Sequence, residues 1–119
     1  MRIIITGSRE HSDEALISKA IAEAAAGVDS NSVTIVHGAA RGADTLAANA
    51  ARRLGLATEA HAADWDRLGK RAGFIRNAEM AKLGADICLA FPIGESRGTR
   101  MMIDLAKKHG IEVQVYEAP

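Results

Sequence analysis

Three short segments of this sequence combine glycine with arginine, a combination that suits the binding of phosphate. They are residues 7–9, 37–44 and 92–99. Glycines let a backbone approach an anion closely, free N–H groups at a helix start can donate to it, and the helix dipole attracts negative charge. Arginine adds charged, forked hydrogen bonds that match phosphate oxygens. The segments therefore predict an anion-binding site.

The candidate ligand-binding residues of these segments are small, hydroxyl-bearing or basic, with one carboxylate among them. They are Gly7, Ser8, Arg9, Gly38, Ala39, Arg41, Gly42, Asp44, Pro92, Gly94, Ser96, Arg97, Gly98 and Thr99. Each segment alone is also compatible with a plain turn, because a short glycine motif is a weak signal. The convergence of three segments favours a site. Asp44 would repel phosphate, so it suits either ribose hydroxyls or the cap of the next helix.

A fourth region, residues 64–80, adds further candidates for the same site: Asp64, Trp65, Lys70, Arg76 and Asn77. Trp65, the only tryptophan, could stack on a base or close the edge of the core. Met80 and Leu83 recur at helical spacing and predict a helix with its apolar side toward the core. Arg76 and Asn77 would then lie on its flank, either reaching into the site or pointing to solvent.

Short strand-like runs alternate with longer helical stretches along the chain. We expect strands at residues 3–6, 33–36, 57–61, 86–91 and 111–116, and helices between Ser12 and Gly27 and at 42–54, 72–83 and 98–109. Ser12 would supply a capping hydroxyl and Gly27 would stop the first helix. Such alternation indicates βαβ units with right-handed crossovers. The sequence therefore predicts an α/β fold, a single Rossmann-like domain over residues 1–119 with about five parallel strands and helices on both faces.

The predicted fold brings the candidate segments together. In an open parallel sheet, ligands bind beyond the carboxyl ends of the strands, near the point where the strand order reverses. The three glycine segments follow the first, second and fourth predicted strands. We therefore expect them at one edge of the sheet.

Charge and composition exclude several classes of protein. Fifteen basic and fifteen acidic side chains cancel, and only four residues are aromatic, which argues against a nucleic-acid-binding protein. No apolar run approaches the length of a membrane span, and the N-terminus is too short for a signal peptide, so we expect a cytoplasmic protein without a membrane partner.

Metal and cysteine chemistry are also not expected. Cys88 is the only cysteine and lies in an apolar run, which predicts a buried structural thiol. The four histidines are widely spaced and have no cysteine partners, so we expect neither a metal site nor a cofactor. For His37, a hydrogen-bonded position at the end of the second strand is favoured over contact with a ligand.

The segments together resemble the SLOG superfamily, which includes the Lonely Guy phosphoribohydrolases and the DNA-processing DprA proteins. They are most similar to its small YspA/cpYpsA-related branch. The matching residues are Gly7-Ser8-Arg9, the run from His37 to Asp44, Asp64-Trp65, Lys70, Gly73, Arg76-Asn77, Met80, Phe91-Pro92, Gly94, Gly98-Thr99 and Met102. The resemblance implies a Rossmann-like fold that binds nucleotides or nucleotide-derived ligands, such as nucleoside phosphates or ADP-ribose, and that forms a homodimer or higher homo-oligomer.

The Lonely Guy enzymes hydrolyse the N-glycosidic bond of nucleoside monophosphates with the signature Pro-Gly-Gly-x-Gly-Thr-x-x-Glu and an arginine from a preceding helix. Arg76 matches that arginine and Gly98-Thr99 matches the Gly-Thr pair, but residues 93–97 form a longer loop and Met102 stands at the position of the final Glu. A carboxylate stabilises the positive sugar or activates water, and methionine can do neither.

The resemblance therefore favours a nucleotide-binding domain that acts as a sensor, a carrier or a sequestering protein. The alternative is an enzyme, a nucleoside-phosphate or nucleotide-sugar hydrolase, in which Arg76 stabilises charge and Asp44, Asp64 or Glu95 replaces the catalytic carboxylate. A further alternative is DprA-like binding of single-stranded DNA, against which the zero net charge weighs.

Overall fold

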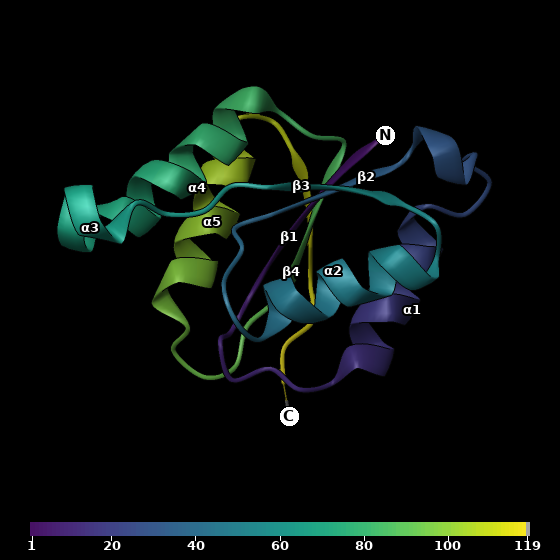
Figure 1. Ribbon diagram of the computed structural model, residues 1–119, viewed down its shortest axis with the longest axis horizontal. Helices are drawn as coiled ribbons and strands as arrows, with labels where there is room; N and C mark the ends of the chain where they lie inside the picture. Colours follow the sequence, from purple (N-terminus) through teal and green to yellow (C-terminus); the bar gives the residue numbers. More distant parts are fainter. Residues whose placement is uncertain (119) are drawn as a thin grey trace.

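A computed structural model describes residues 1–118 of the chain (Figure 1). The strands are β1 (Arg2–Gly7), β2 (Thr34–His37), β3 (Ala57–Ala60), β4 (Ile87–Phe91) and β5 (Glu112–Val115). The helices are α1 (Glu14–Ala24), α2 (Ala43–Arg53), α3 (Trp65–Leu68), α4 (Ala72–Leu83) and α5 (Arg97–Lys108), with short 3-10 turns at Ser30–Ser32 and Gly69–Arg71. The predicted α/β alternation is confirmed.

The strands form one parallel sheet in the order β3-β2-β1-β4-β5. The chain runs outward from β1 to β3, then crosses back to the other side of β1 to form β4 and β5. This is a Rossmann-like topology, as the sequence predicts. The strand order reverses between β1 and β4, so the loops after these two strands diverge and leave a crevice at their carboxyl ends.

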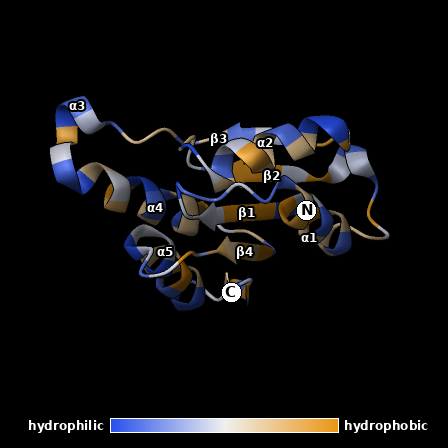
Figure 2. Cartoon of the chain, turned by 90° about the horizontal axis from the view of Figure 1, so that it is seen from below, coloured by the Kyte–Doolittle hydropathy of each residue, from blue (hydrophilic) through white to orange (hydrophobic). Residues whose placement is uncertain are grey.

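Helices cover both faces of the sheet because its central strands are apolar on both sides. Ile3 and Ile5 pack with α1 and α2, whereas Ile4, between them in sequence, packs with Val36, Cys88 and the apolar residues of α4 and α5. Figure 2 shows the hydrophobic centre of β1 and β4 between helices with hydrophilic outer surfaces. Cys88 is buried as predicted, and burial raises the pKa of its thiol to about 12.

Local details of the first helix differ from the prediction. The carboxylate of Asp13, and not the hydroxyl of Ser12, caps α1 by accepting a hydrogen bond from the N–H of Leu16 at 3.0 Å. Asp13 is the residue directly before the first helical residue, which is the position from which a side chain reaches the free N–H groups. The helix ends at Ala24, and Gly27, with φ of 80°, ends the turn that follows.

The connection between β3 and α4 is the other difference. Trp65, expected in a loop, is the first residue of the short helix α3. Its N-cap is Asp64, whose carboxylate accepts from the N–H of Arg67 at 3.2 Å. In Figure 1, α3 projects from the side of the molecule that carries α4. Within residues 1–118, no helix is long and apolar enough to cross a membrane.

Candidate functional site

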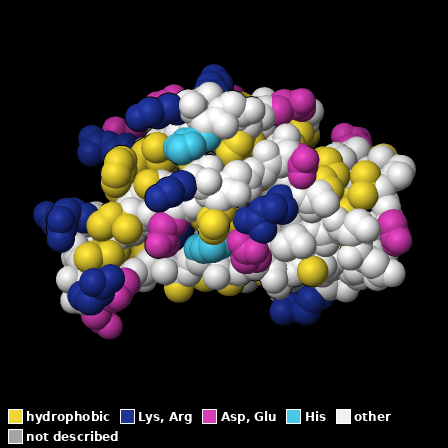
Figure 3. Space-filling view, turned by 90° about the horizontal axis from the view of Figure 1, so that it is seen from above, with side chains coloured by type: hydrophobic (Ala, Val, Ile, Leu, Met, Phe, Trp, Pro, Cys, Tyr) yellow, Lys and Arg dark blue, Asp and Glu magenta, His cyan; other side chains and the backbone are white. Residues whose placement is uncertain are grey.

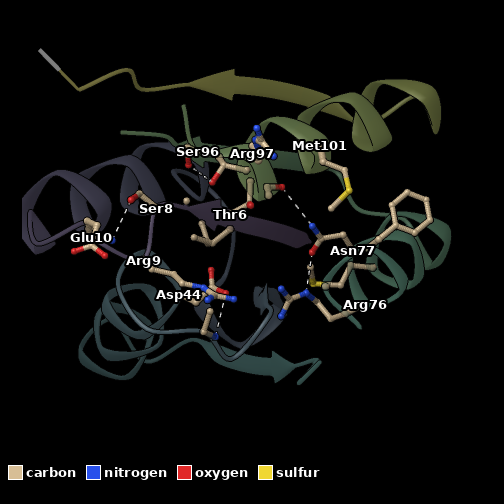
Figure 4. A pocket seen from close by; sticks show the side chains of 18 of the residues that line it. Thr6, Ser8, Arg9, Glu10, Asp44, Arg76, Asn77, Ser96, Arg97 and Met101 are labelled. Carbon is tan, nitrogen blue, oxygen red and sulfur yellow. Dashed lines mark hydrogen bonds between the residues drawn. The ribbon is translucent and has the colours of Figure 1, made fainter. Parts of the chain in front are cut away.

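A cavity of about 510 Å³ lies at the point where the strand order reverses (Figure 4). Its walls come from the end of β1, the start of α5, one side of α4 and the segment between β3 and α4. The predicted residues that line it are Gly7, Ser8, Arg9, Asp44, Trp65, Lys70, Arg76, Asn77, Ser96, Arg97, Gly98 and Thr99. The fold thus brings together candidates from all four sequence regions.

A second hollow, of about 380 Å³, adjoins the first and is lined by Gly38, Ala39 and Arg41. Arg9, Ala40, Trp65 and Arg76 line both hollows. Five candidates line neither of them: Gly42, Asp64, Pro92, Gly94 and Glu95.

The start of α5 offers free backbone donors to the larger cavity. Its N-cap, Ser96, has left-handed backbone geometry with φ of 42°, and no side chain among the described residues caps the helix. The hydroxyl of Ser96 instead donates to that of the buried Thr99 at 2.8 Å. A Cβ added at Gly98 would meet nothing within 4 Å. The first turn of α5 is therefore open to a ligand, and its N–H groups and dipole favour an anion.

The loop between β2 and α2 differs, because its own side chains occupy its N–H groups. Oδ2 of Asp44 accepts from the N–H of Gly38 at 3.1 Å and from that of Ala40 at 3.3 Å. Nδ1 of His37 accepts from the N–H of Ala39 at 3.0 Å. His37 is thus a hydrogen-bonded histidine at the end of β2, as predicted. These three N–H groups are paired within the loop and are not free donors for a ligand.

Asp44 is held in an unusual electrostatic environment. It is buried, and burial raises the pKa of its carboxyl well above the ordinary value, to about 6, although the N–H of Ala40 and the charge of Arg76 act in the opposite direction. Figure 4 shows Arg9 and Arg76 approaching Asp44 from two sides. The capping interpretation of Asp44 is wrong: the N-cap of α2 is Gly42, and the carboxylate turns back to the preceding loop.

Arg76 connects this loop to α4 and α5. Its guanidinium donates to the carbonyl of Gly38 and, at 2.8 Å, to Oδ1 of Asn77, whose amide group donates to the carbonyl of Gly98 at 3.4 Å. Partial burial lowers the pKa of Arg76, while the charge of Asp44 opposes this effect. A Cβ at Gly38 would collide with the guanidinium, so this glycine makes room for Arg76.

Gly7 and Gly42 are required for packing between loops. A Cβ at Gly42 would collide with the carbonyl oxygens of Ser8 and Arg9, and its φ of 74° is unfavourable for other residues. A Cβ at Gly7 would collide with the side chain of Ala43. These two glycines let the loop after β1 lie against the start of α2.

Arg9 and Trp65 form one wall between the two hollows. The guanidinium carbon of Arg9 lies 5.5 Å from the centre of the Trp65 ring, within the range of a cation–π interaction. The ring edge of Trp65 lies against the first turn of α4, since a Cβ at Gly73 would be 3.2 Å from it. Lys70 lies on the same side of the cavity and is exposed.

Two of the predicted acid/base residues lie outside the cavity. Asp64 is exposed, and a hydrogen bond from Arg67 lowers the pKa of its carboxyl. Glu95 is also exposed and pairs with Arg97 at 3.0 Å. Met102, which stands where the Lonely Guy signature has glutamate, is buried in the core between α4, α5 and the sheet.

The apolar side of the cavity, which includes Phe74 and Met101, was not among the residues predicted from the sequence. The spacing held a usable signal, because Phe74 precedes the candidate Asn77 by three residues, which places both on one side of a helix. Among the described residues, no group of three or more histidine, cysteine, aspartate or glutamate side chains is placed to hold a metal ion.

Comparison with known proteins adds two similarities. The family model described as the YspA, cpYpsA-related SLOG family matches residues 1–68, from β1 to α3. The gene 61 protein of Mycobacterium phage D29 is 44% identical over 117 residues, which cover 94% of this chain and 93% of the phage protein. No solved structure matches the chain.

Proposed function

Because the chain belongs to the YspA, cpYpsA-related SLOG family, we propose that it binds a nucleoside phosphate, or a ligand derived from one such as ADP-ribose, in the cavity at the carboxyl edge of the sheet. The ligand's phosphate lies at the first turn of α5, and its sugar lies between Asp44 and Arg76. Such a domain acts by retaining the ligand, as a sensor, a carrier or a sequestering protein.

The observation that carries this proposal is the uncapped start of α5. Its free N–H groups face a cavity, and Gly98 leaves open space beside them. A helix start of this kind attracts phosphate through both hydrogen bonds and the helix dipole. The cavity volume of about 510 Å³ also falls within the range of roughly 300–1,000 Å³ for small-molecule sites.

Basic residues at the cavity support an anionic ligand of limited size. Four basic side chains line it against two acidic ones, Glu10 and Asp44, while the molecule as a whole carries no net charge; the basic ones are Arg9, Lys70, Arg76 and Arg97. The positive potential is therefore local, which suits a small phosphate-bearing ligand better than a long nucleic acid. Homodimer formation and a cytoplasmic location stay predictions from the sequence.

The test is incubation with a panel of nucleoside mono- and diphosphates and ADP-ribose, read by mass spectrometry for retained ligand, followed by calorimetry with a compound that is retained. We expect Gly98→Ala to weaken binding at least ten-fold, because its methyl group occupies the approach to the helix start. Arg9→Ala weakens binding by a similar factor. Arg52→Ala, which removes an exposed arginine outside both hollows, leaves it unchanged.

Retention of no compound in the panel contradicts the proposal. So does unchanged affinity in the Gly98→Ala variant, because the phosphate would then lie elsewhere.

A second candidate function is hydrolysis of the N-glycosidic bond, and the environment of Asp44 favours it. A carboxyl with a pKa of about 6 can exchange protons near neutral pH, and Asp44 lies at the cavity beside Arg76. Release of free base from a nucleotide, lost in Asp44→Asn with binding retained, would identify the protein as a hydrolase. No release from any nucleotide in the panel would exclude this second function.

A further inference from the structure

We propose that Phe74 and Met101 take the flat face of the ligand's nucleobase, so that the site binds base-bearing phosphates in preference to bare sugar phosphates. The inference rests on the proposed function, since it divides the same cavity into a phosphate end and a base end. Phe74 and Met101 form an apolar wall that is separate from the phosphate-binding start of α5.

The aromatic residues of the chain fall into two pairs with different surroundings. Phe91 is fully buried and stacks on Tyr116 with ring centroids 5.0 Å apart. Trp65 and Phe74 are 47% and 53% exposed, and both line the cavity. Half of the few aromatic side chains thus lie on the wall of one hollow. Figure 3 shows hydrophobic side chains gathered beside Lys and Arg on the part of the surface over α4.

Of these two rings, Phe74 is the one available to a ligand. Arg9 lies over the ring of Trp65, and α4 lies against its edge. Within residues 1–118, Phe74 has no aromatic or cation–π partner. Trp65 therefore contacts Arg9, whereas Phe74 lines the cavity without such a partner.

Met101 places the apolar wall at a suitable separation from the phosphate end. It lies one helical turn after Arg97, so it stands about 5 Å along α5 from the free N–H groups. In Figure 4, Met101 lies on the same side of the cavity as Asn77, across from Ser8 and Glu10. Thioether sulfur is polarizable and packs well on flat aromatic groups. A base held between Met101 and Phe74 can remain joined to a phosphate at the start of α5.

The amide of Asn77, which lines the same cavity, already makes two hydrogen bonds. Asn77 accepts from Arg76 through Oδ1 and donates to the carbonyl of Gly98 through its amide nitrogen. These two bonds use one N–H and one lone pair of the amide and hold it in place between α4 and α5. The wall contacts the face of the base, which all nucleobases share, and we expect similar affinities for different bases.

Calorimetry with adenosine 5′-monophosphate and ribose 5-phosphate tests this inference, because both carry the phosphate and only one carries a base. We expect the nucleotide to bind about ten-fold more tightly, the factor typical of one stacked base. Phe74→Ala brings the affinity for the nucleotide down to that for ribose 5-phosphate and leaves the latter unchanged. Leu83→Ala, at an exposed apolar residue of the same helix outside both hollows, changes neither.

Equal binding of the two probes by the unmodified protein overturns the base subsite while leaving the phosphate site in place. Unchanged nucleotide affinity in Phe74→Ala, or equal weakening of both probes, also overturns it. Binding of neither probe contradicts the proposed function and this inference together.

Discussion

The segments after β2 and β4 both combine glycine and arginine near the start of a helix, yet they use their backbones differently. After β2, Asp44 and His37 accept from the N–H groups of Gly38, Ala39 and Ala40. After β4, the hydroxyl of Ser96 bonds to Thr99, and no described side chain caps α5. The first loop is satisfied from within, and the second leaves its donors to solvent or a ligand.

The glycines of the two loops differ in the same way. Gly42 is surrounded by backbone oxygens of the loop after β1, whereas a Cβ at Gly98 would enter open space. A glycine can therefore be required by a neighbouring segment of the protein or by the approach of a ligand, and its sequence context does not distinguish these cases. Substitution by alanine does distinguish them.

The largest expected effect is on folding. Gly42→Ala lowers the free energy of unfolding by about 3 kcal/mol or more, because alanine is strained at φ of 74° and its methyl group collides with the carbonyls of Ser8 and Arg9. Gly98→Ala does not lower it and raises it by up to about 1 kcal/mol, since the added methyl group meets no atom and alanine is the better helix former. Urea unfolding of both variants measures the difference, and equal losses would show that the two loops do not differ as described.

A smaller effect concerns pH and the loop after β2. The pKa of Asp44 is about 6 in the folded protein, above its value in the unfolded chain, so the folded state binds more protons between about pH 4 and pH 6. The contribution of Asp44 to stability is therefore largest below about pH 4 and is lost as the pH rises through 6, by up to about 3 kcal/mol.

The Asp44→Asn variant isolates this dependence. Its amide oxygen can accept from Gly38 and Ala40 as Oδ2 of Asp44 does, but it does not titrate. The unfolding free energy of the unmodified protein minus that of the variant should fall between pH 4 and pH 7 in urea titrations. A difference that stays constant over this range would mean that Asp44 has an ordinary pKa.

The smallest expected effect concerns Glu95 in the loop after β4. Its ion pair with Arg97 has both side chains largely exposed, at 76% and 89%, so solvent screens it. Glu95→Gln should alter the unfolding free energy by no more than about 0.5 kcal/mol and leave nucleotide binding and any base release unchanged. Loss of base release in this variant alone would restore Glu95 as an acid/base residue.

The sequence determined the fold and predicted the location of the candidate site. The short apolar runs are long enough for strands only, and the longer amphipathic stretches have the spacing of helices. Their alternation therefore specified a parallel sheet covered by helices on both faces. Glycine segments after the first, second and fourth strands also pointed to one edge of the sheet, since the carboxyl ends of parallel strands lie together.

Only the tertiary structure decided what each residue does at that edge. Asp44 satisfies its own loop, Gly42 accommodates Ser8 and Arg9, and Gly98 faces open space. Phe74 joined the site although it belongs to no motif, because α4 turns it toward the cavity. Hydrogen-bond partners and free volume depend on segments far apart in the chain. Spacing along the sequence can place a residue at the carboxyl edge of the sheet, but it does not show which neighbouring group accepts a hydrogen bond from its N–H.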